Sequence, residues 1–430
     1  MKTTEVLVIG GGIGGLTIAL KLVQRGVHVT LVEKLPGNNK VYKGELLQPK
    51  SMQIFDKLGM HDLVKNSSKQ IDVLDLIELD RNNLVKDQSF MDYRVLPQPY
   101  NASYMIHHEE LKKILRDIAL TFEEFTYYPA TSCTSIDGHI AQMKQGQETF
   151  EIQATYIIGA EGRASVTRKA MNQSVTNFTY NHHFLTVTFP RPENFEGGQI
   201  ISTYNRFLGL FPLPDNQVRS VYLIPAGEYK KIKEKPIAYF HKLYTDLAPA
   251  IDGYVQELRD WKKIQLMIPI KYHADKYTDG HLAIIGDAAH AVHPMAGEGM
   301  NMAIQDADVL GELLADILDN KTSDISWYEK VRRPRVSFML QMSHLSALAY
   351  SFPYQSVSWF RRKAFERIEE DPTLHYKQML NVSGLGIWKE SIQDRFIQGG
   401  LLPKRMGEVS LGVKEKHVFN DQQDYPWKRK

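Results

Sequence analysis

The strongest constraint on the fold of this chain is its amino-terminal run, which reads as strand, glycine-rich turn, helix and strand. Residues 5–9 are almost continuously apolar, as expected for a strand buried on both faces of a parallel sheet. Residues 10–15 read GGGIGG and match G-x-G-x-x-G, and the helix that follows is closed by Gly26. A second strand, residues 27–32, then leads to Glu33. This order predicts the first unit of a dinucleotide-binding domain.

Each glycine of the G-x-G-x-x-G pattern has its own physical role. Gly10 permits the tight turn, Gly12 lets the backbone approach a pyrophosphate, and Gly15 lets helix and strand pack closely. The free N–H groups and the positive dipole at the helix amino terminus favour phosphate. Glu33 lies at the usual distance to bind a ribose 2′-hydroxyl, which favours an adenosine without a 2′-phosphate. The pattern fits NAD and FAD equally well. The residues expected at the cofactor are Gly10, Gly12, Ile13, Gly14, Gly15, Glu33 and Lys34.

A second block with similar order occurs far along the chain. Residues 282–285 form another short apolar strand, which ends at Gly286-Asp287. A loop containing Pro294 leads to Gly297-Glu298-Gly299, and apolar residues then recur at helical spacing as far as Asn320. The block therefore predicts a strand, a glycine-containing loop and a long amphipathic helix.

Two histidines in this loop invite a metal interpretation. His290 and His293 have a spacing that places two ligands on one face of a helix. However, Pro294 disfavours helix at the residue before it. We therefore expect a loop here, and no metal site.

In order, the strand, Gly-Asp, Pro and Gly-x-Gly before a helix resemble the second flavin motif of class A FAD-dependent monooxygenases, the aromatic-hydroxylase or para-hydroxybenzoate hydroxylase-like type. The resemblance covers about residues 2–320. It implies that Asp287 hydrogen-bonds the ribityl chain of FAD. It also implies that residues 297–301 present backbone N–H groups to the pyrimidine end, where reduced flavin is negatively charged. The cofactor-binding residues implied here are Asp287, Pro294, Gly297, Gly299, Met300 and Asn301.

Two further segments match the family with substitutions. Residues 156–168 resemble its internal motif near the flavin pyrophosphate, with Glu161 where the family has aspartate. The family usually has arginine, facing the flavin phosphates or ribityl chain, at the position of His108. Histidine is shorter and only partly charged at neutral pH. Either cofactor affinity is lower, or Lys43, expected close to the isoalloxazine, compensates.

Composition narrows the class of protein further. The 430 residues admit two or three domains, and the net charge of +2 gives no electrostatic case for nucleic acid. The single cysteine, Cys133, excludes an internal disulfide and fits a reducing cytoplasm. No apolar leader or bilayer-length apolar run is visible, so we expect a cytoplasmic protein without stable membrane insertion. The basic residues 427–430 are expected to form a solvated terminus.

The predicted fold is α/β, with a Rossmann-like FAD-binding domain of the glutathione reductase type, an antiparallel β-sheet substrate domain and a helical carboxy-terminal region. The FAD-binding domain is assigned residues 1–70, 96–175 and 275–335. The substrate domain is assigned residues 71–95 and 176–274, and the helical region residues 336–430. Alternating runs around residues 80–83 predict a hairpin that leaves the nucleotide domain. Residues 125–158 predict a three-stranded meander. Residues 337–365 predict a helix packed on the domain surface and interrupted by Pro353.

The antiparallel sheet is expected to cover the flavin and form the substrate cavity, as the resemblance implies. Tyr204, Phe211 and Tyr222 are candidate cavity aromatics, although aromatic residues at such positions are also common in ordinary cores.

The predicted function is that of a single-component monooxygenase that uses FAD and NADPH or NADH to insert one atom of O2 into an aromatic or polyketide-like molecule. The sequence identifies no catalytic acid, base or nucleophile. An alternative is a reductase or epoxidase of an isoprenoid-type substrate, since residues 44–49 resemble a segment of squalene- and polyprenyl-type monooxygenases. A flavin-binding protein without turnover is a further alternative. A flavin halogenase is disfavoured, because no two tryptophans lie two positions apart as in the W-x-W-x-I-P segment.

Overall fold

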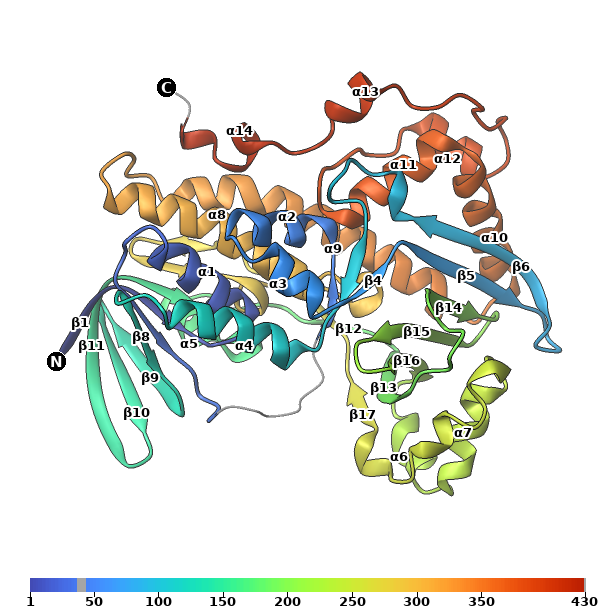
Figure 1. Cartoon of the computed structure of the whole chain (residues 1–430), viewed down its shortest axis with the longest axis horizontal. Coiled ribbons are helices and arrows are strands. Elements are labelled where there is room, and N and C mark those ends of the chain that lie inside the picture. Colours follow the sequence, from blue (N-terminus) through green and yellow to red (C-terminus); the bar gives the residue numbers. More distant parts are fainter. Residues whose placement is uncertain (37–43, 429–430) are drawn as a thin grey trace.

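The computed structural model describes residues 1–36 and 44–428, and its larger sheet carries the predicted dinucleotide-binding order. The central strands run β19-β20-β11-β1-β2-β8, and the four central pairings from β20 to β8 are parallel. Figure 1 shows this sheet at the left. The bounds are β1 Lys2–Ile9, β2 Val29–Val32, β8 Phe125–Tyr128, β9 Thr131–Asp137, β10 Ile140–Gln145, β11 Glu148–Gly159, β19 Thr278–Asp279 and β20 Leu282–Ile284.

The meander predicted for residues 125–158 differs at its first strand. Antiparallel β9, β10 and β11 form the meander, whereas β8 pairs parallel with β2 from Val29 to Val32. Parallel pairing needs a crossover, and the helix α4 between β2 and β8 in the chain supplies it. A strand at the sheet edge and a strand of a hairpin have the same local pattern, so the sequence alone did not separate them.

Helices cover this sheet and position the glycine turns. α1 follows the first turn, α8 follows the second, and the two helices pack against each other. Their buried residues join those of β1, β11 and β20 in the largest apolar core. The bounds are α1 Ile13–Val23, α2 Pro49–Lys57, α3 His61–Asn66, α4 His108–Ala119, α5 Val166–Ala170 and α8 Gly299–Leu318.

A second, seven-stranded sheet has the order β17-β13-β16-β15-β14-β5-β6 and is seen at the right of Figure 1. The predicted hairpin is confirmed as β5 and β6, and β5 joins β14 by parallel pairing of Leu76 with Ile200. The bounds are β5 Val73–Leu79, β6 Val85–Asp92, β13 His182–Pro190, β14 Gly198–Ser202, β15 Phe207–Leu213, β16 Gln217–Pro225 and β17 Gln265–Met267.

The two faces of this second sheet contact different parts of the chain. Alternate residues of β16, such as Tyr222, pack with Tyr244 of α7 in one core. The residues between them, such as Leu223, belong to another core that contains Tyr376 and Met379 of α11. This division follows the period of two along a strand. The helices on the first face are α6 Glu228–Lys233 and α7 Ile237–Thr245.

Two three-stranded sheets are formed by short segments of both parts of the chain. One has the order β3-β7-β4 and the other β12-β18-β21. Their bounds are β3 Leu46–Leu47, β4 Lys69–Ile71, β7 Ser103–Met105, β12 Phe178–Thr179, β18 Ile270–His273 and β21 His290–Ala291.

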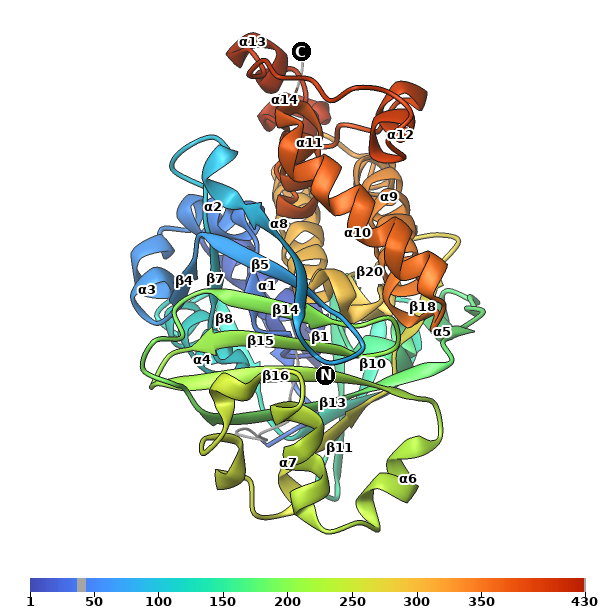
Figure 2. The ribbon, with the colours of Figure 1, turned by 90° about the vertical axis from the view of Figure 1, so that its right-hand side faces the viewer.

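The carboxy-terminal region is helical, and the predicted interruption at Pro353 is confirmed by the break between α9 and α10. Figure 2 shows these helices above the edge of the second sheet. The fold class predicted from the sequence is thus confirmed. The bounds are α9 Ser326–Ser351, α10 Gln355–Glu370, α11 Pro372–Ser383, α12 Ile392–Gln398, α13 Leu411–Glu415 and α14 Asp421–Asp424.

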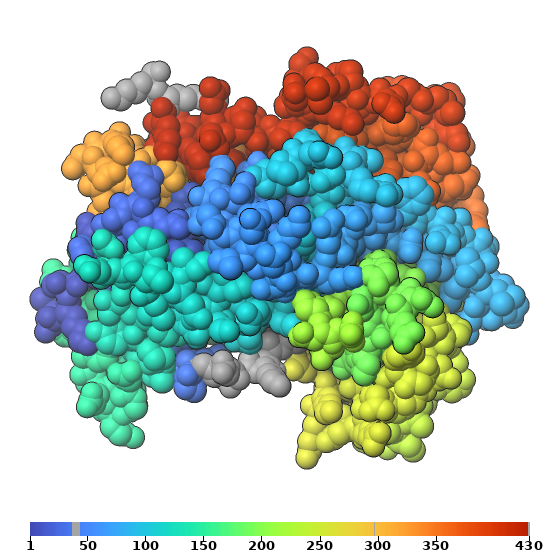
Figure 3. Space-filling model, viewed as in Figure 1, coloured from blue at the N-terminus to red at the C-terminus, as the bar shows by residue number. Residues whose placement is uncertain are grey.

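The expectation of a solvated terminus at residues 427–430 is wrong for its described part. The Trp427 indole N–H donates to Asp316 Oδ2 at 3.0 Å, and Lys428 forms an ion pair with Glu312. The segment just before it is also anchored, since Asp424 forms ion pairs of 2.6 Å with the buried Lys50 and with Arg335. Figure 3 shows the carboxy-terminal residues running across the surface of the molecule. The sequence signal for this docking is the acidic stripe Asp308, Glu312 and Asp316, spaced four residues apart on α8.

Candidate active site

The first glycine turn has the geometry that its sequence predicts. Gly10 has φ of +113°, and a Cβ added there would lie 2.3 Å from the Ala160 carbonyl oxygen. A Cβ added at Gly15 would lie 1.9 Å from the Gly10 carbonyl oxygen, which explains why helix and strand can approach only with glycine. A Cβ added at Gly12 meets no atom within 4 Å. Packing therefore requires two of these glycines, while Gly12 borders open space at the start of α1.

Glu33 braces this turn from the end of β2. Its Oε2 accepts a hydrogen bond from the Gly11 N–H at 2.6 Å, and its Oε1 accepts one from the Leu35 N–H at 2.8 Å. Carboxylate oxygens have further lone pairs, so these bonds leave acceptor capacity for a hydroxyl. Lys34 is exposed beside it.

The second turn is held by a buried ionic cluster that the sequence analysis missed. Asp306 Oδ2 accepts hydrogen bonds from the Gly286 N–H at 3.0 Å and from His290 Nε2 at 2.7 Å. Its Oδ1 accepts from Arg332 Nε at 2.8 Å, and Arg332 Nη1 donates to Gln305 at 2.9 Å. Burial by itself raises the pKa of Asp306, but the charges and hydrogen bonds of His290 and Arg332 lower it to about 2. The cluster fixes the backbone at Gly286, directly before Asp287.

Asp287 itself remains accessible to a ligand. Its side chain is 45% exposed, and its Oδ2 lies 3.7 Å from Arg163 Nε. Its backbone carbonyl accepts a hydrogen bond from the Tyr272 hydroxyl, and the next carbonyl, of Ala288, accepts from Arg168 at 2.7 Å. The backbone is thus pinned on two sides while the carboxylate is available for a hydroxyl group.

The family substitution at Glu161 has a local structural use. Its carboxylate accepts hydrogen bonds from the Ser165 hydroxyl at 2.7 Å and from the Thr167 N–H at 2.9 Å and hydroxyl at 2.6 Å. It therefore binds the amino-terminal end of α5, where a negative charge is favoured.

Asn301 joins the second block to the segment after Lys43. Its Oδ1 accepts from the Gln48 N–H at 2.8 Å and from the Ser51 hydroxyl at 2.7 Å. Its Nδ2 donates to the carbonyls of Leu46 and Gly297, both at 2.9 Å. All four bonds of the amide are used for structure. Asn301 thus positions the loop rather than presenting its side chain to a ligand.

The remaining residues of the second block form the loop before α8. Pro294 begins a 3-10 turn, Gly297 has φ of +65°, and Gly299 and Met300 are the first residues of α8. A Cβ added at Gly44 would lie 3.3 Å from the Met300 Cβ, so the two segments pack closely.

His108 and Lys43 were predicted to act on the same cofactor. His108 begins α4 and is buried, with Nδ1 3.1 Å from the Gly44 carbonyl oxygen. Lys43 lies outside the described residues. Glu45, which directly follows Gly44, forms a two-point ion pair with Arg219 of β16, with both N–O distances 2.7 Å. This pair connects the segment after Gly44 to the second sheet.

The three candidate cavity aromatics lie in different environments. Phe211 is half-buried on the sheet face that packs with Met295 of the second loop. Tyr222 lies on the opposite face, stacked on Tyr244 with ring centroids 5.3 Å apart. Tyr204 is half-buried in the turn between β14 and β15. Strand alternation places Phe211 and Tyr222 on opposite faces of the sheet, and the cavity roles of the three aromatics stay predictions.

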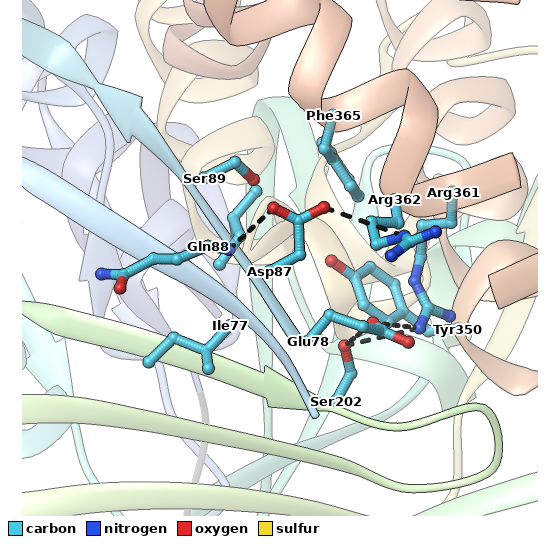
Figure 4. Close-up of a pocket in the computed structure, with 11 residues that line it drawn as sticks. Ile77, Glu78, Asp87, Gln88, Ser89, Ser202, Tyr350, Arg361, Arg362 and Phe365 are labelled. Atoms are coloured by element: carbon cyan, nitrogen blue, oxygen red, sulfur yellow. Dashed lines mark hydrogen bonds and ion pairs between the residues drawn. The ribbon is translucent and has the colours of Figure 1, made fainter. Parts of the chain in front are cut away.

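A separate hollow between the β5–β6 hairpin and α10 is lined by charged side chains that pair with one another (Figure 4). Arg361, one of the lining residues, donates to Glu78 at 2.7 Å, and Glu78 also accepts from Ser202 at 2.8 Å. Arg362 lies 3.8 Å from Asp87. We attribute these groups to packing of α10 on the sheet.

Two absences concern residues 1–36 and 44–428 only. No group of three or more histidine, cysteine, aspartate or glutamate side chains there is arranged to hold a metal ion. In the same ranges, no helix has both the length and the apolar composition needed to cross a bilayer.

Comparison with known proteins identifies the family of this chain. The family described as an FAD binding domain matches residues 3–343. The chain is 27% identical over 348 residues to 6-methylpretetramide 4-monooxygenase of Streptomyces rimosus, covering 77% of this chain and 80% of the relative. It is 24% identical to the ubiquinone hydroxylase of Rhodospirillum rubrum, covering 86% of each. The crystal structure of p-nitrophenol 4-monooxygenase from Pseudomonas putida superposes with a TM-score of 0.79 at 18% identity, covering 89% of this chain and 99% of that one. The chain therefore belongs to the FAD-binding-domain family, and it is an FAD-dependent monooxygenase.

Proposed function

We propose that this enzyme hydroxylates an aromatic or polycyclic small molecule bound between the loop before α8 and the second sheet. The observation that supports this most is an apolar surface. The sheet face that bears Phe184, Phe207 and Phe211 belongs to one core with Met295, which directly follows Pro294. Apolar and aromatic walls favour a ring compound and exclude water from the reaction.

The residues present fit FAD at both glycine turns. Gly12 borders open space, and neither α1 nor α8 has a side chain that caps its first N–H groups. These N–H groups would bind the pyrophosphate at α1 and the pyrimidine end at α8, and Asp287 would bind the ribityl hydroxyls. Glu33 would bind the ribose. When bound, FAD supplies electron transfer from NADPH or NADH and the activation of oxygen.

The chain's own residues then have positioning roles. Asp306 and Arg332 hold the turn that carries Asp287, and Asn301 holds the loop before α8 against Gln48. The aromatic face of the second sheet would orient the substrate. The similar proteins described above are named for 6-methylpretetramide, ubiquinone and p-nitrophenol, and a ring substrate for this chain is consistent with those names.

The test is a screen of aromatic and polycyclic compounds with the purified FAD-loaded enzyme. A substrate should stimulate oxidation of NADPH or NADH and consumption of O2, and the product should gain one oxygen atom by mass spectrometry. Product formed without O2, with two added hydrogen atoms, would instead indicate reduction of a double bond. If no compound stimulates O2 consumption above the blank, the proposed substrate class is wrong.

A matched pair of variants tests the cofactor residues separately from the substrate. Gly12→Val places a side chain in the open space at α1, so the free protein should unfold at the wild-type temperature but lose bound FAD. Gly407→Val is the control, because a Cβ there also meets no atom within 4 Å and lies far along the chain. Wild-type FAD content in Gly12→Val would contradict the proposed pyrophosphate position.

A further inference from the structure

The loop before α8 contains a buried acid with no hydrogen-bond partner. Glu298 is 0% exposed, and neither of its carboxyl oxygens has a hydrogen-bond partner. It occupies the cap position of α8, yet its side chain does not cap the helix. An ionised carboxylate without hydrogen bonds in a protein interior is strongly disfavoured.

The charged and polar groups next to Glu298 form no ion pair or hydrogen bond with its carboxyl group. Arg332 is the charged residue that acts on it, but its guanidinium is already bonded to Asp306 and Gln305. The Gln48 side chain lies nearby, and its Nε2 is also buried without a hydrogen-bond partner. Its Oε1 accepts from the buried Tyr93 hydroxyl at 3.0 Å. Two unpartnered polar groups therefore share the space between the segment after Gly44 and the start of α8.

We propose that Glu298 is a neutral carboxylic acid at the pyrimidine end of FAD, so that it places no second negative charge beside the one that reduction adds there. The inference rests on the FAD position proposed above. Reduction by NADPH or NADH transfers two electrons and one proton as hydride, which leaves one negative charge on the flavin. A second negative charge on Glu298 would be repelled. Where Glu298 is ionised beside oxidised flavin, reduction draws one proton from solvent onto its carboxylate.

Burial supports the neutral form. It raises the pKa of Glu298 well above the usual range, and the opposing effects of Arg332 and Gln48 are smaller than that of burial. The folded protein thus holds a proton that the unfolded chain releases, and stability should fall as pH rises above 4.5, the ordinary pKa of the group.

Two measurements test this without reference to a substrate. The midpoint potential of bound FAD is measured against pH in the wild type and in Glu298→Gln. In the wild type, proton uptake should rise at alkaline pH from about one to about two protons per two electrons, and in the variant it should stay at about one. The stability of the FAD-free protein should decline with rising pH in the wild type and less so in Glu298→Gln.

Controls make each result decisive. Glu408→Gln changes an exposed acid and should behave as the wild type in both measurements. Glu298→Met, which is apolar and of similar volume, is the second variant if Glu298→Gln does not fold. Equal pH dependence of wild type and both Glu298 variants would overturn the inference. Loss of the substrate-dependent reaction with the expected pH dependence intact would overturn only the proposed function.

Discussion

Asp306→Asn is the substitution with the clearest expected magnitude, because it removes one charge from a fully buried cluster. Asp306 bonds the Gly286 N–H, His290 and Arg332, and both it and Arg332 are at most 1% exposed. The pKa of Asp306 is about 2, below its ordinary 3.8, because its partners' charges outweigh the burial that would raise it. This difference corresponds to about 2 kcal/mol of stability at neutral pH.

The full effect should exceed this value. Asparagine leaves Arg332 buried without its counter-ion, and breaking such a pair costs about 3–5 kcal/mol. The sign with pH follows from the lowered pKa of Asp306. Its contribution is present above pH 3.8 and is lost as pH falls towards 2, so the difference between wild type and variant should shrink below pH 4.

The assay is urea denaturation of the FAD-free protein, followed by FAD titration. Asp306→Asn should unfold at lower urea than the wild type and bind FAD more weakly, because the Gly286 backbone loses its anchor. Adding Arg332→Met should recover part of the stability, since it removes the stranded charge. An Asp306→Asn protein that unfolds at the wild-type urea concentration would refute the reasoning.

Two further predictions concern regions outside the cofactor turns. Deletion of residues 420–430 should destabilise the protein by about 3–5 kcal/mol, because the buried Lys50 loses its counter-ion Asp424. Lys50→Met in the shortened protein should recover part of this loss. The unfolding temperature is measured for both proteins. His182 and His293 are in contact at 2.9 Å, and burial lowers their pKa values to about 4 and about 2. Each histidine should therefore lower the free energy of unfolding by about 1.4 kcal/mol per pH unit as pH falls from 6.5 towards its lowered pKa. His182→Phe should reduce this dependence of stability on pH. An unchanged dependence in the variant would contradict the role given to the pair.

The sequence predicted those features that depend on local geometry. The roles of Gly10 and Gly15 follow from the tight turn itself, and the structure shows the two close contacts that only glycine permits. The hairpin around residues 80–83 and the break at Pro353 likewise follow from turn residues and a missing N–H. At these positions the conformation favoured by neighbouring residues in the sequence is the one found in the folded protein.

The parts that could not be predicted depend on contacts between distant segments. Arg332 reaches Asp306 from the next helix, and nothing in the pattern of α9 marks it as a partner. The face on which Tyr222 lies depends on the register of β16, and a shift of one residue would reverse it. Glu298 reads as an ordinary polar loop residue until its burial is known.

The ion pair of Glu45 and Arg219 predicts that binding of substrate and binding of FAD affect each other, and two substitutions test this. Glu45 follows Gly44 beside the start of α8, Arg219 projects from the sheet face opposite Tyr222, and their two bonds of 2.7 Å connect the two parts. Glu45→Leu with Arg219→Met replaces the pair by apolar side chains, which should leave stability unchanged or raise it by about 1–4 kcal/mol. We expect the protein to fold and bind FAD, and the change in FAD affinity on adding substrate should be smaller in this variant than in the wild type. If titrations give the same coupling in both proteins, the two parts communicate by other contacts, and the pair serves packing alone.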